Sequence, residues 1–491
     1  MSIIDSLLSV IQPLNIILLF FGVFAGVLVG AIPGLTATLA ISLLLPFTFM
    51  LSAGPALLML LGIYIGGMYG GSITAILIRA PGTPGAVATS FDGYPLTQKG
   101  EGGRALGIAA TASFFGGLIS VILMIILSPF ISKFAIQFSS AEYFALACFG
   151  LTIIFSVSGD SLLKGAIVGV LGLLFATVGV DPISPFPRFT FGTDTLVIGL
   201  PLLPVIIGLF AVSEVFRMFE SEKESTDNVP KKVNRIVPTF KELNQLKWLF
   251  TKSGLIGSFI GALPGAGANI ASFVSYGEAK RSSKNPEKFG KGNIEGVAAS
   301  EAANSAVTGG ALIPTLTLGI PGDAVTAVLL GALTIQGLQP GPLLFQQHSD
   351  LIRMIYVGLF IALIFQITIA LLGAKQISKI SSLKKTTLIP IIATFSLIGA
   401  YVAEISSYHM TVALVFGVIG YLLEKFKFPV APMALAFILG TIIEKSLRTA
   451  IMRSDEGLLI FISSPISIVL ISATIIFVVY SLVRQRTKKA H

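Results

Sequence analysis

Two Pro-Gly motifs in this chain carry residue types that suit the binding of an anion. Residues 30–34 read Gly-Ala-Ile-Pro-Gly, and residues 261–265, offset by 231 positions, read Gly-Ala-Leu-Pro-Gly. Proline and glycine break a helix, and a helix that restarts after the break has free N–H groups and a partial positive charge at its first turn. Carboxylates and phosphates bind at such helix ends. Neutral donors follow both motifs, and the predicted substrate-binding residues here are Gly34, Thr36, Thr38, Gly265, Gly267, Asn269 and Ser272.

The same residues have an alternative interpretation, in which they only pack helices together. Glycine, alanine, serine and threonine allow transmembrane helices to approach closely. One such motif alone favours packing. Two motifs at matched positions favour a site, because broken helices at corresponding positions of two halves mark the binding site of a secondary transporter.

A second pair of Pro-Gly segments follows the first pair along the chain. Residues 79–89 contain Pro-Gly twice, and residues 319–326 place Asp323 directly after Pro-Gly. These Pro-Gly pairs predict unwound backbone, whose carbonyl groups can coordinate a coupling cation. Asp323 is an intramembrane carboxylate, which is usually functional, but it also suits the N-cap of the next helix, and both roles are compatible. The predicted coupling-ion or substrate residues are Thr83, Pro84, Gly85, Gly322, Asp323 and Thr326.

A polar stripe precedes the second of these segments. Glu301, Asn304, Ser305 and Thr308 are spaced by three and four residues, so they share one helical face. Asn304, Ser305 and Thr308 join the predicted substrate site, whereas the more ordinary interpretation places Glu301 at the water interface. Residues 92–104 are rich in glycine and charge and predict a polar turn between spans.

The composition is that of a membrane protein. Hydrophobic residues make up 54% of the 491 residues and charged residues 12%, and residues 6–78 carry no charged side chain. We therefore expect an all-α polytopic membrane protein with roughly 11–13 transmembrane segments, in two inverted repeats with broken or re-entrant helices. The net charge of +9 is spread over short loops, which favours positive-inside topology over nucleic-acid binding. One cysteine and three scattered histidines predict no metal site beyond a transported Na⁺, and no catalytic motif is present.

The largest cluster of basic residues lies near the middle of the chain. We divide the chain into an N-terminal membrane repeat (1–216), a cytoplasmic linker with an interfacial helix (217–252), a C-terminal membrane repeat (253–464) and a final transmembrane helix with a basic tail (465–491). Thr239 and Glu242 have capping-box spacing and predict the start of a short helix in the linker.

At these motifs the chain resembles the large membrane subunit of the tripartite tricarboxylate transporter family, the TctA type. The resemblance covers nearly the whole chain and rests on residues 30–38, 81–106, 262–267, 289–299, 309–314, 318–322 and 337–342. It implies cation-coupled uptake of carboxylates across a bacterial inner membrane, driven by Na⁺ or H⁺ and without a cofactor. It also implies two protein partners: a small four-helix membrane subunit and a periplasmic or lipid-anchored substrate-binding protein. Ser300 and Ser305 depart from the family pattern, which has proline and asparagine there. The shorter side chain of Ser305, near the predicted site, leaves the size of the substrate open.

Two other classes of function remain open from the sequence. A passive anion channel or a structural permease scaffold would differ from a symporter in lacking uphill transport. An intramembrane enzyme would need a catalytic dyad or a metal cluster.

Overall fold

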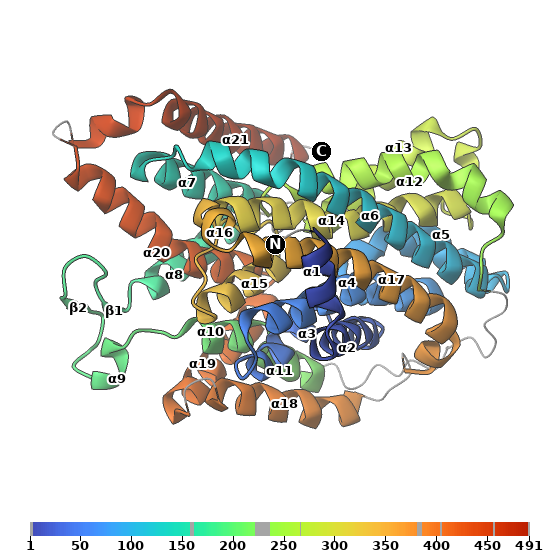
Figure 1. The fold of residues 1–491 in the computed structure, drawn as a ribbon, viewed down its shortest axis with the longest axis horizontal. Coiled ribbons are helices and arrows are strands. Elements are labelled where there is room, and N and C mark those ends of the chain that lie inside the picture. Colours follow the sequence, from blue (N-terminus) through green and yellow to red (C-terminus); the bar gives the residue numbers. More distant parts are fainter. Residues whose placement is uncertain are drawn as a thin grey trace.

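The computed structural model describes residues 3–157, 162–220, 236–265, 267–380, 385–402, 405–454 and 457–489. The all-α prediction is confirmed, because these residues form helices joined by short connections, with one small two-stranded sheet. In Figure 1 the helices pack side by side in one bundle, with the sheet projecting at its left edge. The helices before the linker are α1 (Ile3–Ile11), α2 (Pro13–Gly30), α3 (Ala37–Leu44), η1 (Leu45–Thr48), α4 (Ala53–Ile78), η2 (Pro84–Ala86), α5 (Val87–Gln98), α6 (Gly102–Ala135), α7 (Ser140–Val157), α8 (Leu162–Ala176), α9 (Asp194–Val197), α10 (Leu202–Ile207), η3 (Gly208–Val212) and α11 (Ser213–Glu220).

The helices after the linker follow a similar order of long and short elements. They are α12 (Phe240–Gly261), α13 (Gly267–Ser282), η4 (Pro286–Lys288), α14 (Ile294–Leu318), α15 (Ala324–Ile335), α16 (Pro342–Gln347), α17 (Ser349–Ile380), α18 (Lys385–Val402), α19 (Ser407–Lys425), α20 (Ala431–Met452), η5 (Gly457–Ile462) and α21 (Pro465–Lys489).

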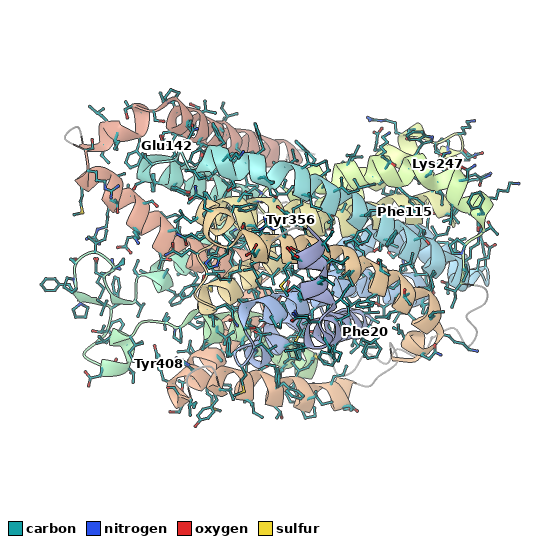
Figure 2. The ribbon with its side chains drawn as sticks, in the orientation of Figure 1. Phe20, Phe115, Glu142, Lys247, Tyr356 and Tyr408 are labelled. Atoms are coloured by element: carbon teal, nitrogen blue, oxygen red, sulfur yellow. The ribbon has the colours of Figure 1, made fainter. Side chains whose placement is uncertain are left out.

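Within the described residues, six helices are long and apolar enough to cross a membrane, and six shorter helices are also apolar. The polytopic prediction is thus confirmed, while the number of 11–13 segments stays a prediction. Large apolar side chains are also exposed on the bundle, among them Phe20 on α2 (45%) and Phe115 on α6 (36%), which Figure 2 labels. An apolar outer surface suits contact with lipid.

Glycine residues bring the backbones of α2 and α4 together. A methyl group at Gly66 would lie 2.2 Å from the carbonyl oxygen of Val23, and one at Gly26 would lie 2.4 Å from that of Ile63. After the linker α12 packs on α14 in the same way, since a methyl group at Gly257 would lie 2.3 Å from a backbone oxygen of α14. Small residues therefore do pack helices here. This packing fixes the helix that leads into each Pro-Gly motif.

The helices break at the predicted motifs. Gly34 and Gly265 have left-handed φ values of 85° and 79°, so the two copies share a local backbone conformation. The second pair of breaks also match, because α4 ends at left-handed Arg79 and α14 ends at left-handed Gly319. Broken helices are confirmed at both pairs of motifs. The inverted relation of the two halves and the limits of the domains stay predictions.

The predicted capping box is present at the start of α12. The Thr239 hydroxyl accepts a hydrogen bond from the Glu242 N–H, and the Glu242 carboxylate accepts one from the Thr239 N–H at 2.7 Å. However, α12 runs on to Gly261 and is no short helix confined to the linker. Linker residues 221–235 lie outside the described part of the chain.

The projecting hairpin consists of β1 (Gly179–Val180) and β2 (Pro187–Arg188). An ion network joins it to α20: Arg188 contacts Glu444 at 2.5 Å, and Arg448 contacts Asp181 at 2.5 Å. Hydrogen bonds from the Ser184 and Ile183 N–H groups, together with Arg448, hold the pKa of the Asp181 carboxyl well below its ordinary value.

Candidate binding site

Both Pro-Gly motifs and both later segments meet at one cavity of about 750 Å³. The cavity is lined by ten of the sixteen residues predicted from sequence, although they span the chain from residue 34 to residue 323. These ten are Gly34, Thr36, Thr38, Thr83, Pro84, Gly85, Gly265, Gly267, Asn269 and Asp323. The six that do not line it are Ser272, Asn304, Ser305, Thr308, Gly322 and Thr326.

The first turns of α3 and α13 supply helix N-termini to the cavity. Thr36 is the N-cap of α3, and its hydroxyl oxygen accepts a hydrogen bond from the Leu39 N–H at 3.2 Å. α13 begins at Gly267, whose left-handed φ of 58° favours glycine, and the exposed Asn269 follows within the first turn. Each helix therefore points its free N–H groups and its positive dipole end toward the cavity.

Hydrogen bonds hold the breaks next to one another. The Gly265 N–H donates to the Gly322 carbonyl at 2.7 Å, so the first and second breaks after the linker are joined directly. Before the linker the Gly82 N–H donates to the carbonyl of Gly71 on α4 at 3.1 Å. Gly322 also donates its N–H to the Thr315 hydroxyl. Gly322 itself does not line the cavity, but it links Gly265, which does, to α14.

Asp323 performs the capping role and also lines the cavity. Its Oδ1 accepts a hydrogen bond from the Thr326 N–H at 2.8 Å, and the Thr326 hydroxyl completes a capping box at the start of α15. Its Oδ2 accepts a hydrogen bond from the Tyr64 hydroxyl of α4 at 2.6 Å. Thr326 is buried within this capping box. Both carboxylate oxygens of Asp323 are therefore already engaged.

Sequence reasoning missed two segments that line the cavity, one within residues 202–220 and one at residues 424–435. The first of them carries an ion pair. A π-helical turn, η3, interrupts residues 202–220, and such turns are often found at functional sites. Past it, Glu214 and Arg217 line the cavity and form an ion pair at 2.6 Å. Arg217 also donates to the Gly34 carbonyl at 3.3 Å and lies 3.8 Å from Glu424. Glu214 and Arg217 are spaced i, i+3 at the end of an apolar run, and this spacing could have indicated an ion pair on one helical face. The prediction instead placed Arg217 in the linker.

The polar stripe lies behind the cavity, in the interior. Glu301, Asn304, Ser305 and Thr308 are all buried on α14, so the interpretation of Glu301 as an interfacial residue is wrong. Asn304 comes nearest to the cavity, since a methyl group at Gly85 would meet its Oδ1. The buried Ser272 hydroxyl donates to the Ala268 carbonyl within α13. The substrate roles of these residues stay predictions.

The predicted polar turn at residues 92–104 is mostly helix. α5 extends to Gln98, and Asp92 lies within it, fully buried. The Asp92 carboxylate accepts hydrogen bonds from the N–H groups of Gly290, Gly292 and Asn293 at 2.7–2.9 Å, and from the Tyr276 hydroxyl at 2.8 Å. Asp92 therefore ties α5 to the connection between α13 and α14.

A family model described as "Tripartite tricarboxylate transporter TctA family" matches residues 16–435, a range that contains every residue lining the cavity. The chain belongs to the TctA family. Membership in this family makes it a membrane subunit of a tripartite tricarboxylate transporter and a multi-pass membrane protein.

Two similar proteins come from Agrobacterium vitis. The "Uncharacterized 52.8 kDa protein in TAR-I ttuC' 3'region" is 37% identical over 478 residues, which are 96% of this chain and 94% of that protein. The "Uncharacterized protein in TAR-II ttuC' 3'region" is 35% identical over 230 residues, which are 46% of this chain and 93% of that protein. No solved structure is significantly similar to this TctA-family chain.

Proposed function

We propose that this chain is the permease subunit of a cation-coupled secondary transporter that imports carboxylates, tricarboxylates or related organic anions, across a bacterial inner membrane. The proposal depends on one observation: helix N-termini from two duplicated motifs, α3 and α13, converge on a single cavity. Its volume of about 750 Å³ is ample for a small organic acid. Two helix ends match an anion that carries carboxylates at separated positions.

Substrate recognition in this proposal depends on N–H groups and neutral side chains. Arg217 is the cationic residue among those that line the cavity in the described chain, and Glu214 already neutralises it at 2.6 Å. Thr36, Thr38 and Asn269 supply hydroxyl and amide donors, and Asn304 lies behind Gly85 with its amide oxygen toward that glycine. Helix dipoles add positive potential without a mobile charge.

The charge of the cavity supports coupling to a cation. Glu214, Asp323 and Glu424 line it together with Arg217, so the carboxylates outnumber the guanidinium group. This excess of carboxylates repels a carboxylate substrate, so a cation that enters with the substrate lowers the repulsion. Asp323 and the unwound backbone at residues 83–85 are the proposed contacts of the cation or the substrate in this wall.

Two exposed charged residues, Arg217 and Glu424, line the cavity with side-chain exposures of 45% and 37%, whereas Thr38 and Thr83 in its lining are buried. We propose that a substrate-binding protein delivers the substrate and that a small membrane subunit completes the complex, in accord with the tripartite description of the family.

Uptake into proteoliposomes tests this proposal. The chain, reconstituted with its small subunit and binding protein, is given a panel of labelled di- and tricarboxylates under imposed Na⁺ or H⁺ gradients. We expect accumulation against the substrate gradient. Uptake that only equilibrates the substrate would instead establish the passive channel.

Two variants test the location of the site. Asn269→Ala and Thr38→Val each remove a neutral donor, and the loss of about 0.5–1.5 kcal/mol per hydrogen bond corresponds to an increase in KM of about 2- to 12-fold. Thr251→Ala, on the exposed face of α12, is the matched control and leaves KM unchanged. A double Asn269→Ala, Thr38→Val variant with the KM of the unmodified protein would place the substrate elsewhere and leave the motifs with a packing role.

A further inference from the structure

A fully buried carboxylate lies one side chain away from the cavity, and the proposed function does not use it. Glu301 on α14 is 0% exposed and accepts hydrogen bonds from three different neighbouring helices. Its Oε2 accepts from the hydroxyls of Ser72 on α4 and Thr89 on α5, and its Oε1 accepts from the Ser113 hydroxyl on α6 at 3.0 Å and from the Asn304 amide at 3.1 Å. Four neutral donors thus surround Glu301.

Glu301 has no counter-charge within the described part of the chain. The titratable group that faces it is the hydroxyl of Tyr69 on α4, which is itself buried and finds no hydrogen-bond partner in the segments that the structure describes. Asp92 on α5 is engaged by backbone N–H groups and by Tyr276, and Arg104 on α6 is paired with Glu101 and Glu242. A buried ionised carboxylate without a paired cation is costly, so Glu301 requires a proton or a metal cation when it is enclosed.

Asn304 connects Glu301 to the cavity. Its amide nitrogen donates to Glu301 and to the Met68 carbonyl at 3.1 Å. Its Oδ1, in a side chain that is 0% exposed, has no hydrogen-bond partner among the described residues. That oxygen faces Gly85, and both Met68 and Gly85 line the cavity. Thr83, 5% exposed and on the cavity wall, has a hydroxyl that also lacks a partner within the described part of the chain. Unpartnered buried oxygens beside a carboxylate are typical of a site for a hard cation or a proton.

We propose that Glu301 takes up the coupling cation, Na⁺ or a proton, and that Asn304 transmits this event to the substrate cavity. The inference rests on the proposed cation-coupled function and assigns the coupling to Glu301 in place of Asp323. Asp323 caps α15, so the Thr326 N–H and the positive end of that helix already stabilise its charge, whereas the donors to Glu301 are neutral side chains. An empty, charged Glu301 holds the Asn304 amide toward itself. A neutralised Glu301 releases that amide, which then turns to donate to a carboxylate in the cavity. The two ligands therefore bind cooperatively, and each raises the affinity for the other by the same factor.

The test compares Glu301→Gln, which keeps the shape but removes the charge, with Glu278→Gln. Glu278 is a surface carboxylate of α13 paired with Lys252. KM for the labelled carboxylate is measured in proteoliposomes with Na⁺ varied at fixed pH, and with pH varied in the absence of Na⁺. In the unmodified protein and in Glu278→Gln, the effective ion lowers KM by about 5- to 150-fold, the usual range of a coupling between sites. In Glu301→Gln the KM with the ion equals the KM without it, and transport of the substrate down its own concentration gradient persists.

The Na⁺ series and the pH series also show which ion Glu301 takes up. If Na⁺ activates the unmodified protein but not Glu301→Gln, the coupling ion is Na⁺. If low pH activates the unmodified protein but not Glu301→Gln, the coupling ion is a proton. An ion dependence that survives unchanged in Glu301→Gln overturns the inference while leaving the proposed function intact. Failure of the unmodified protein to transport any carboxylate would instead refute the proposed function.

A second pair of variants covers the case in which Glu301→Gln does not fold. Ser113→Ala and Thr89→Val each remove one donor to Glu301 and keep the charge. Both are expected to shift the ion concentration or the pH at half-activation. An unchanged half-activation point in both variants also overturns the inference.

Discussion

Substitution of Gly85 by alanine is expected to disturb the site directly, because Gly85 lies between the cavity and Asn304. A methyl group at this position would lie 2.0 Å from Asn304 Oδ1 and 2.8 Å from the Ala268 side chain. Neither neighbour yields easily, since Asn304 is anchored to Met68 and Glu301 and Ala268 lies in the first turn of α13. Gly85→Ala must therefore displace α13 or break the Asn304 hydrogen bonds.

Overpacking of this kind costs about 1–3 kcal/mol. If the strain weakens substrate binding, KM rises by about 5- to 150-fold. If the strain instead destabilises the folded protein, the melting temperature in detergent falls. Uptake kinetics and thermal unfolding are therefore measured on the same preparation. Gly277→Ala is the control, because a methyl group there meets nothing within 4 Å and lies inside α13. That control is expected to stabilise the protein by about 0.5–1 kcal/mol. A Gly85→Ala protein with the KM and melting temperature of the unmodified one would refute the packing of Gly85 against Asn304.

Three further outcomes are expected. Asp92→Ala leaves three backbone N–H groups and the Tyr276 hydroxyl without their acceptor, which should lower the free energy of unfolding by about 3 kcal/mol or more in denaturation experiments. Asn228→Cys, in a chain whose Cys148 is replaced, should react with an impermeant thiol reagent only after the cells are permeabilised, and labelling from outside would contradict the cytoplasmic linker. The Asp181 carboxylate, whose pKa is depressed, stabilises the hairpin at pH values above its unfolded pKa of about 3.9, and this stabilisation is lost as the pH falls through the lower folded pKa. Limited proteolysis between pH 5 and 8 should therefore spare the hairpin of the unmodified protein and cleave it in Asp181→Asn.

Much of the candidate site was predictable because its signals are local. Proline and glycine determine where α2, α4, α12 and α14 end, whatever the rest of the chain does. The capping residues Thr36, Thr239 and Asp323 follow the same logic, since each needs only the N–H groups of its own first turn. Duplication then indicated that the broken segments belong together, and they line one cavity.

The parts that sequence reasoning missed depend on contacts between distant segments. Arg217 reaches Gly34 across 183 positions, and Asp92 reaches the loop before α14 across about 200. No local pattern encodes those partners. Glu301 shows the same limit, because its spacing predicted a helical face but not that Ser72, Thr89 and Ser113 would enclose it. The length of α12 was also missed, since its first half is polar enough to resemble a surface helix.

The packing and functional interpretations of the Pro-Gly motifs describe the same physical arrangement. A methyl group at Gly82 would lie 2.1 Å from the carbonyl oxygen of Gly30, so the second break packs directly on the end of α2. Only glycine permits this approach, and the approach brings residues 83–85 and 34–38 to one cavity. The N–H groups that the breaks leave unpaired would be costly in an apolar interior, unless water or a polar ligand bonds them. Close packing of the breaks therefore supports the anion site that we propose. Glu301 is buried directly behind it and has no counter-charge among the described residues, which supports the proposed entry of a cation together with the anion.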